Sequence, residues 1–299
     1  MMSKKMRMNS NGVLAAVVAG ALWFAPLPVA AQQTFPTADA AAAALVDAIS
    51  SKNQAALRTV LGHDWKNFIP TANIEDKDVD AFLAEWAVSH KIVTNSAQTA
   101  HLAVGAQDWV LPIPIVEKKA AWRFDPRAAA DEIKTRRIGD NELATMQAAL
   151  AYYDAQKEYA SADRNGNGTL EYAQQIVSTP GKQDGLYWAQ LEGEEASPLG
   201  PLYGEAKRGY DYHGYHYRIL TAQGKDAPGG AYDYRIKSRL VAGFALIAWP
   251  VKYGDTGVMS FMVSHDGVLY EKNLGSKTDS VARSITRFNP DNGWQKVNP

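Results

Sequence analysis

A polar loop in the middle of the chain carries oxygen-bearing side chains at the spacing of a calcium-binding loop. Gly168 follows three donors at alternating positions, as in the first half of an EF-hand loop. The candidate metal ligands are Asp163, Asn165, Asn167, Thr169 and Glu171. The position where such loops close with a bidentate Glu holds the neutral Gln174. The sequence leaves two interpretations open: a weak Ca²⁺ site, and a metal-free turn rich in the Asn and Gly that turns favour.

Aromatic residues are dense between residues 187 and 234, where they could form a binding surface. Exposed Tyr and Trp combine a flat apolar face with a polar tip, which suits sugars, peptides and protein partners. The candidate ligand-binding residues are Tyr187, Trp188, Tyr212, Tyr215 and Tyr217. The alternative is that these rings pack against one another across the strands of a sheet.

No arrangement of residues in the sequence predicts catalysis, and we expect no catalytic residues. The chain has no Cys, which excludes disulfides, thiolate nucleophiles and Cys-ligated metals. The motifs Gly-x-Ser-x-Gly and His-Glu-x-x-His are absent. Ser264, His265 and Asp266 are contiguous, so they cannot face one another as a catalytic triad requires. The sequence therefore favours a protein without catalytic activity and leaves an enzyme as the alternative.

The first 31 residues have the three-part pattern of a secretory signal peptide. Lys4, Lys5 and Arg7 precede an uncharged apolar run over residues 13–24, and a stretch of small residues ends at Ala31. This run is shorter than the roughly 20 residues of a membrane-spanning helix. We therefore expect cleavage after Ala31 and a periplasmic protein without a transmembrane segment.

The charge of the remaining chain bears on its partners. After residue 31 there are 28 Lys and Arg against 32 Asp and Glu. A mildly acidic chain without a basic run is unsuited to nucleic acid or to anionic membranes. The expected partner is an envelope protein or a small ligand.

The apolar pattern predicts an α+β fold in two lobes, over residues 32–139 and 140–299. In the first lobe, Thr37, Asn53 and Asp78 each precede or begin a stretch with apolar residues at helical spacing. The period then changes to that of strands, which predicts that three helices are followed by a small sheet.

A β-hairpin should complete the first lobe. Its strands are expected over residues 109–116 and 122–124, on either side of a polar turn. Pro112 and Pro114 should restrict the first strand to a sheet edge or a bulge, because proline cannot donate a ladder hydrogen bond.

Two successive helices should then connect the lobes. Asp125 caps the first at Pro126, and that helix is expected to end near Gly139. Asp140 or Asn141 should cap the second helix, which packs on a C-terminal antiparallel sheet. The residues expected to be buried there are Leu143, Met146, Leu150 and Tyr153.

Antiparallel strands should follow from residue 215 onward. Asp266-Gly267 predicts a tight hairpin turn, because Gly accepts the positive φ that such turns require. The residues after 275 should form a short helix and a tail. The expected strands cover residues 215–221, 240–249, 258–264 and 268–272.

Several short sequence motifs resemble those of an exported bacterial family known as domain of unknown function 2950. They are spread over essentially the whole chain after residue 31. Among them are Arg-Ile-Gly-Asp-Asn-Glu-Leu at 137–143, Asp-Gly-Leu-Tyr-Trp at 184–188 and Gly-Gly-Ala-Tyr-Asp-Tyr at 229–234. Others lie at 122–125, 152–160, 197–202, 215–221, 254–257 and 265–267. This resemblance implies export and no assigned activity.

Two partial resemblances suggest architecture. The first lobe resembles the cone-shaped nuclear-transport-factor-2-like superfamily, and the second resembles the globular domain of type II secretion pseudopilins. A pseudopilin begins with an apolar assembly helix, whereas here another lobe comes first, so filament assembly is not expected. A shared fold also carries no function by itself.

Two functions of different classes follow. The first is a non-catalytic periplasmic protein that binds a ligand or a partner. The second is a periplasmic hydrolase whose site is built from dispersed residues. A deep pocket with clustered carboxylates or histidines would favour the enzyme.

Overall fold

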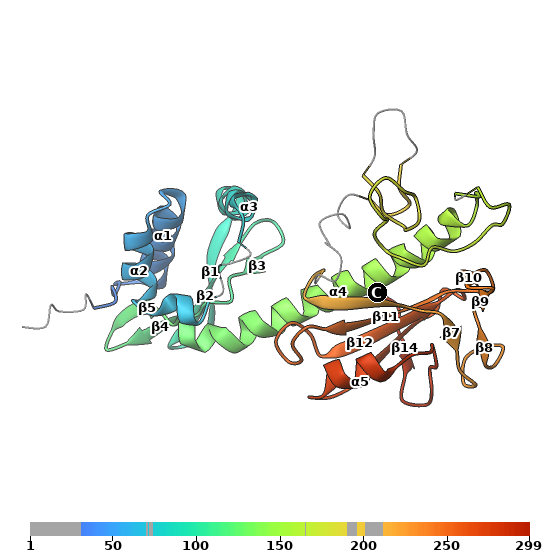
Figure 1. Ribbon diagram of the computed structural model, residues 1–299. Helices are drawn as coiled ribbons and strands as arrows, with labels where there is room; N and C mark the ends of the chain where they lie inside the picture. The colour runs from blue at the N-terminus through green and yellow to red at the C-terminus, as the bar shows by residue number, and fades with distance from the viewer. Residues whose placement is uncertain (1–30, 70, 72–73, 165, 190–195, 201–211) are drawn as a thin grey trace, which may run out of the picture.

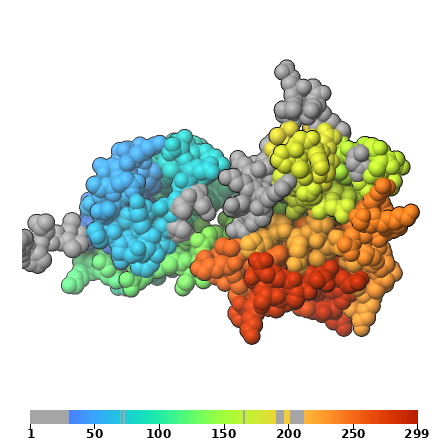
Figure 2. Space-filling model, in the orientation of Figure 1, coloured from blue at the N-terminus to red at the C-terminus, as the bar shows by residue number. Residues whose placement is uncertain are grey.

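The computed structural model describes residues 31–299 except 70, 72–73, 165, 190–195 and 201–211. Two lobes are joined by one long helix, α4 (Pro126–Tyr159), which is green in Figure 1. Figure 2 shows the same two bodies, one blue to cyan and the other yellow to red. The predicted α+β class is confirmed. Residues 1–30 of the predicted signal peptide lie outside the described residues.

Two helices of the first lobe begin at the predicted polar residues. The Thr37 hydroxyl accepts the N–H of Ala40 at 3.1 Å, and α1 spans Ala38–Ser50. The Asn53 amide oxygen accepts the N–H of Ala56 at 3.0 Å, and α2 spans Gln54–Leu61. These caps satisfy N–H groups that have no partner inside a helix.

The third helix, α3 (Asp76–Val88), begins earlier than its predicted start at Asp78. The Asp78 carboxylate instead accepts the N–H of Glu75 at 2.9 Å, so it acts from inside the first turn. A 3₁₀ turn at Trp65–Asn67 lies between α2 and α3.

A small antiparallel sheet completes this lobe. Its strand order is β1-β2-β4-β5, with β3 paired to β2. The strands are β1 (His90–Ser96), β2 (Thr99–Val104), β3 (Trp109–Val110), β4 (Ile115–Lys118) and β5 (Ala121–Phe124). The β4–β5 hairpin confirms the prediction. Pro112 and Pro114 divide the expected first strand into β3 and β4, because neither donates a ladder bond.

The two helices predicted between the lobes are a single helix, so that prediction is wrong. The start is confirmed, because the Asp125 carboxylate accepts the N–H of Ala128 at 3.2 Å. However, α4 continues for 34 residues, through Gly139, to Tyr159. One exposed Gly costs only about 1 kcal/mol in a helix and does not end it. One of the two residues that resemble a second cap, Asn141, donates to the Thr256 carbonyl in the second lobe instead.

The buried face of α4 also differs from the predicted one. Leu143 is 44% exposed, whereas Met146, Leu150 and Tyr153 are half-buried at the edge of the core. The buried side chains of this part of α4 are alanines, two polar residues and two tyrosines. They are Thr145, Ala148, Ala149, Tyr152, Ala155, Gln156 and Tyr159. A stripe of Ala lets the helix approach the sheet closely, while the larger apolar residues flank the contact.

The second lobe is built on an antiparallel sheet of order β14-β13-β12-β11-β6. Figure 1 shows α4 on one side of this sheet and α5 (Thr278–Ser284) on the other. The strands are β6 (Tyr215–Leu220), β11 (Ala245–Pro250), β12 (Met259–Ser264), β13 (Leu269–Asn273) and β14 (Gln295–Lys296). Two short ribbons flank it, made of β7 (Ala222–Gln223), β8 (Tyr232–Asp233), β9 (Arg235–Ile236) and β10 (Arg239–Leu240).

The predicted turn between β12 and β13 is confirmed. Gly267 has a φ of 74°, and its N–H donates to the Ser264 carbonyl at 2.9 Å. The helix and tail expected after residue 275 correspond to α5 and β14.

Each lobe has its own apolar core, one around Leu45, Leu102 and Phe124, the other around Tyr152 and Phe244. Among the described residues, no helix combines the length and the apolar character needed to cross a bilayer.

Candidate functional site

A cavity of about 650 Å³ opens in the first lobe. Residues of α1 and α2 line one side, and residues of α3 line another. The segment from β3 to Ile113, together with Ile133 of α4, completes the wall. Its volume lies within the range of about 300–1,000 Å³ typical of small-molecule sites.

The inside of this pocket is apolar. Leu45, Leu57, Leu61, Trp65 and Ile113 form its buried walls, each less than 10% exposed. Within the described part of the chain, no buried side-chain polar atom that lacks a hydrogen-bond partner lines the pocket. A ligand inside the pocket would therefore be stabilised by dispersion contacts and the hydrophobic effect, and not by hydrogen bonds to the buried wall.

The mouth combines exposed apolar side chains with charges. Ile74 is 51% exposed and Trp109 is 48% exposed. The Lys52 ammonium and the Asp76 carboxylate pair at 3.0 Å across the mouth, linking the α1–α2 turn to the start of α3. Both side chains are largely in solvent, so the pair contributes only about 0–1 kcal/mol.

Helix α3 covers the pocket more than it enters the core. None of its residues is buried, although Phe82 and Trp86 are large and apolar. The Phe82 ring meets the Trp109 ring edge-on at 6.5 Å, and Trp86 stacks on His90. The apolar face of α3 thus borders the cavity, which leaves room for a guest molecule.

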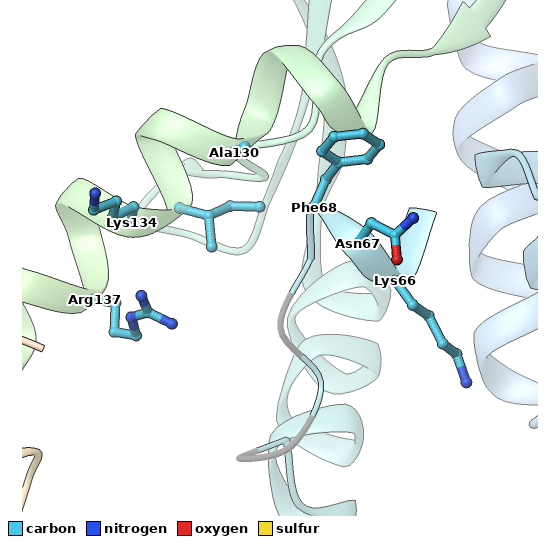
Figure 3. Close-up of a pocket in the computed structure, with 7 residues that line it drawn as sticks. Lys66, Asn67, Phe68, Ala130, Lys134 and Arg137 are labelled. Atoms are coloured by element: carbon cyan, nitrogen blue, oxygen red, sulfur yellow. The ribbon is translucent and has the colours of Figure 1, made fainter. Parts of the chain in front are cut away.

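A second, smaller pocket of about 230 Å³ lies where the first lobe meets α4. Three of its lining residues are basic: Lys66, Lys134 and Arg137. Figure 3 shows the amino ends of Lys66 and Lys134 pointing away from each other, and Arg137 is already paired with the Asp255 carboxylate. Because its charges do not converge, this pocket is not built to hold an anion.

The predicted calcium loop is held together by its own hydrogen bonds. The Asp163 carboxylate accepts the N–H groups of Asn167 at 3.1 Å and Gly168 at 2.7 Å. The Asn167 amide donates to the Glu171 carboxylate at 3.3 Å. Asn165, another predicted ligand, lies outside the described residues.

A guanidinium group from a distant segment contacts the same loop. Arg239 donates to the Thr169 hydroxyl at 2.9 Å and to the Asn167 amide oxygen at 3.4 Å. Its positive charge therefore lies on the Asn167 side-chain oxygen that calcium would need, and beside Thr169, which is expected to bind calcium through its backbone carbonyl. No cluster of three or more His, Cys, Asp or Glu suited to a metal occurs among the described residues. Calcium binding stays a prediction.

The predicted aromatic binding residues do not form one exposed face. Trp188 is 6% exposed and Tyr215 is fully buried, whereas Tyr187, Tyr212 and Tyr217 are half-buried. The Tyr215 hydroxyl donates to the Met259 carbonyl at 2.9 Å. Burial raises the pKa of Tyr215, and the nearby Glu142 carboxylate raises it further. Tyr215 and Trp188 thus serve the core, which leaves the other three as candidates for ligand contact.

The apolar pocket is not among the sites that the sequence predicts. Val79, Phe82 and Trp86 do stand at helical spacing. That pattern is the same for a helix packed on a core and for a helix that borders a cavity. The two cases can be told apart only when the position of α3 relative to α1 and α2 is known.

Comparison with family models assigns nearly the whole described chain to one group. The model described as "Protein of unknown function (DUF2950)" matches residues 32–297. Comparisons with curated proteins and with solved structures find no match, so the pseudopilin and nuclear-transport-factor-2-like resemblances gain no support. The family that the sequence resembles is confirmed: the chain belongs to the DUF2950 family of proteins of unknown function.

Proposed function

We propose that the protein is an exported binding protein that holds a small apolar ligand in the pocket of its first lobe. The observation that carries this proposal is the 650 Å³ cavity with buried apolar walls. Unfilled apolar space costs stability, because the lining atoms lack contacts on one side. A ligand that fills the space supplies those contacts.

The chemistry of the lining supports binding over catalysis. The polar residues of the pocket are Lys52, Gln54, Thr71, Asp76 and Asp78. None of these five is buried, and no histidine lines the cavity. General acid–base catalysis needs a titratable group within hydrogen-bond reach of the reacting atoms. Here the charged groups stand at the rim, away from the enclosed space.

Export to the periplasm is proposed on two observations. The first is the pattern of basic, apolar and small residues that ends at Ala31. The second is that the family match begins at Gln32, directly after the expected cleavage point. A match that omits the first 31 residues agrees with their removal.

Binding of the neutral apolar dye N-phenyl-1-naphthylamine tests the pocket. Dye fluorescence should rise on addition of the protein without its first 31 residues. Ile74→Asp, at the mouth, should weaken dye binding several-fold. Ile236→Asp is a matched control, because Ile236 is 56% exposed on the other lobe while Ile74 is 51% exposed. Equal effects of the two variants, or no dye binding by the unaltered protein, would refute the proposal.

A further inference from the structure

We infer that the ligand is an amphiphile with one apolar chain and an uncharged or cationic head group, and that fatty-acid-like anions bind less well. This inference rests on the proposed function, because it concerns the same pocket. It adds the chemical class of the ligand, which follows from where the pocket is apolar and where it is charged.

The apolar chain belongs inside the cavity. Since no unpartnered buried polar atom of the described residues faces this space, a polar group placed there would lose its water without compensation. The apolar surface also continues outward, because Ile74 and Trp109 are about half-exposed at the mouth. A guest can therefore be longer than the enclosed space and still remain in contact with apolar side chains.

The head group must then lie at the charged rim. Two carboxylates, Asp76 and Asp78, line the pocket there, against one ammonium group, Lys52. Lys52 is already paired with Asp76 at 3.0 Å. The Asp78 carboxylate accepts the Glu75 N–H, and it forms no ion pair within the part of the chain that the structure describes. The net charge of the lining is therefore negative.

The charges on α3 and near Trp109 keep this sign, and Lys66, whose ammonium lies 5.4 Å from the Trp65 ring, lines the smaller pocket instead. On α3, Lys77 is paired with Glu75 at 2.7 Å, and Asp80 adds a further carboxylate. Near Trp109, the Arg136 guanidinium is paired with Glu132 at 2.7 Å. A negative rim repels a carboxylate head and attracts a cationic one, with a strength that salt reduces.

The test compares three probes that share a twelve-carbon chain: dodecyltrimethylammonium, dodecyl maltoside and dodecanoate. Each displaces N-phenyl-1-naphthylamine from the protein without residues 1–31, below its critical micelle concentration. At low ionic strength the cation should bind roughly two- to fivefold more tightly than dodecanoate, since exposed charge pairs contribute about 0.2–1 kcal/mol. Added salt should reduce this ratio.

A pair of variants isolates the rim charge. Asp78→Asn should lower the ratio of cation to dodecanoate affinity, and it retains an oxygen that accepts the Glu75 N–H. Asp80→Asn removes the same charge from α3 at a residue that does not line the pocket, so it should change the ratio less. Equal binding of all three probes, or tighter binding of dodecanoate, would overturn the inference and leave the pocket proposal standing. Failure of every probe and of the dye would overturn both.

Discussion

The Glu142 carboxylate, on α4, accepts the backbone N–H of Met259, the first residue of β12, at 2.9 Å. The same oxygen accepts the N–H of Val258 at 2.8 Å. Five residues earlier on the helix, Arg137 pairs with the Asp255 carboxylate. Two of the sequence motifs that carry the family resemblance, at 137–143 and 254–257, thus contact each other. This contact fixes the middle of α4 to the second lobe.

Substitution of Glu142 should loosen this contact. Glu142→Ala leaves two N–H groups without an acceptor and should lower the free energy of unfolding by about 1–3 kcal/mol. Glu142→Gln keeps an oxygen and removes only the charge, so its loss should be about half as large. Urea denaturation followed by tryptophan fluorescence measures both. Equal losses for the two variants would contradict the role given to the shared oxygen.

Close backbone approach at the same junction predicts a large effect of one added methyl group. A Cβ on Gly257 would lie 2.0 Å from the Tyr215 hydroxyl oxygen, and Tyr215 is fully buried. Gly257→Ala should therefore destabilise the protein by about 1–3 kcal/mol through overpacking. Combination with Tyr215→Phe removes the nearest of three clashing atoms, since the ring carbons Cζ and Cε2 stay at 2.5 and 2.6 Å, and should cost less than the sum of the single changes.

The matched control is Gly139→Ala. A Cβ there meets nothing within 4 Å, and the residue is exposed inside α4. This change should raise the free energy of unfolding by about 0.5–1 kcal/mol, because Ala favours the helix. A loss of stability at Gly139 would show that the connecting helix needs its flexibility at this point.

These junction contacts also show what the sequence could predict and what it could not. The caps at Thr37, Asn53 and Asp125 depend on neighbours within three residues, so local pattern was sufficient. The continuity of α4 was not predictable in this way. Asn141 resembles a cap, yet its amide donates to the Thr256 carbonyl at 2.8 Å, across 115 positions of sequence.

The candidate site was hidden for a related reason. Periodicity identifies the apolar face of a helix and says nothing about how completely that face is covered. Phe82 on α3 belongs to a regular stripe, but it remains half-buried because it lines a cavity that residues of α1 and α2 also line. A cavity depends on how helices and strands are placed relative to one another. The sequence motifs that resemble the family do not lie on α3.

Glu271, on β13, predicts a pH dependence of stability. Burial raises its pKa, and the Glu142 carboxylate raises it further. The folded state therefore holds the proton of the Glu271 carboxyl more tightly than the unfolded chain does. The resulting stabilisation of the folded state is present below the ordinary Glu pKa of 4.5 and is lost as the pH rises through the raised pKa. Glu271→Gln should therefore stabilise the protein modestly at pH 7 and have no effect in acid.

Asp291 serves as a control, because its pKa shift predicts the opposite pH dependence of stability. The Gly293 N–H and Lys272 lower its pKa, so its stabilisation is present above the ordinary Asp value and lost as the pH falls. Asp291→Asn should thus lower the melting temperature slightly at pH 7. Melting curves of both variants across the acid range check the two signs. A shift of the same sign in both would contradict the assignment.

Export predicts a new N-terminus. Protein recovered from the periplasm should begin at Gln32, which intact-mass measurement and N-terminal sequencing both detect. Ala31→Arg should block processing, because signal peptidases require a small residue there. An intact Met1 on unaltered protein in the membrane fraction would contradict cleavage.

The loop at Asp163 allows the two interpretations of its sequence to be separated. Asp163→Ala removes the acceptor for the Asn167 and Gly168 N–H groups, so the melting temperature should fall even without calcium. Asp163→Asn keeps one accepting oxygen and should fall less. These losses measure the turn itself.

Addition of several millimolar CaCl₂ then tests the metal. Arg239 places a positive charge on the Asn167 side-chain oxygen and on the hydroxyl of Thr169, whose backbone carbonyl is the expected ligand, so calcium would have to displace it. Calcium affinity should therefore be no better than the millimolar range of weak extracellular sites. Arg239→Ala should strengthen it, because the competing charge is gone. A calcium-dependent rise in melting temperature that Arg239→Ala enlarges and Asp163→Ala abolishes would establish the site. If calcium leaves the unaltered protein and Arg239→Ala alike unchanged, the loop is a polar turn held by Asp163 and Arg239.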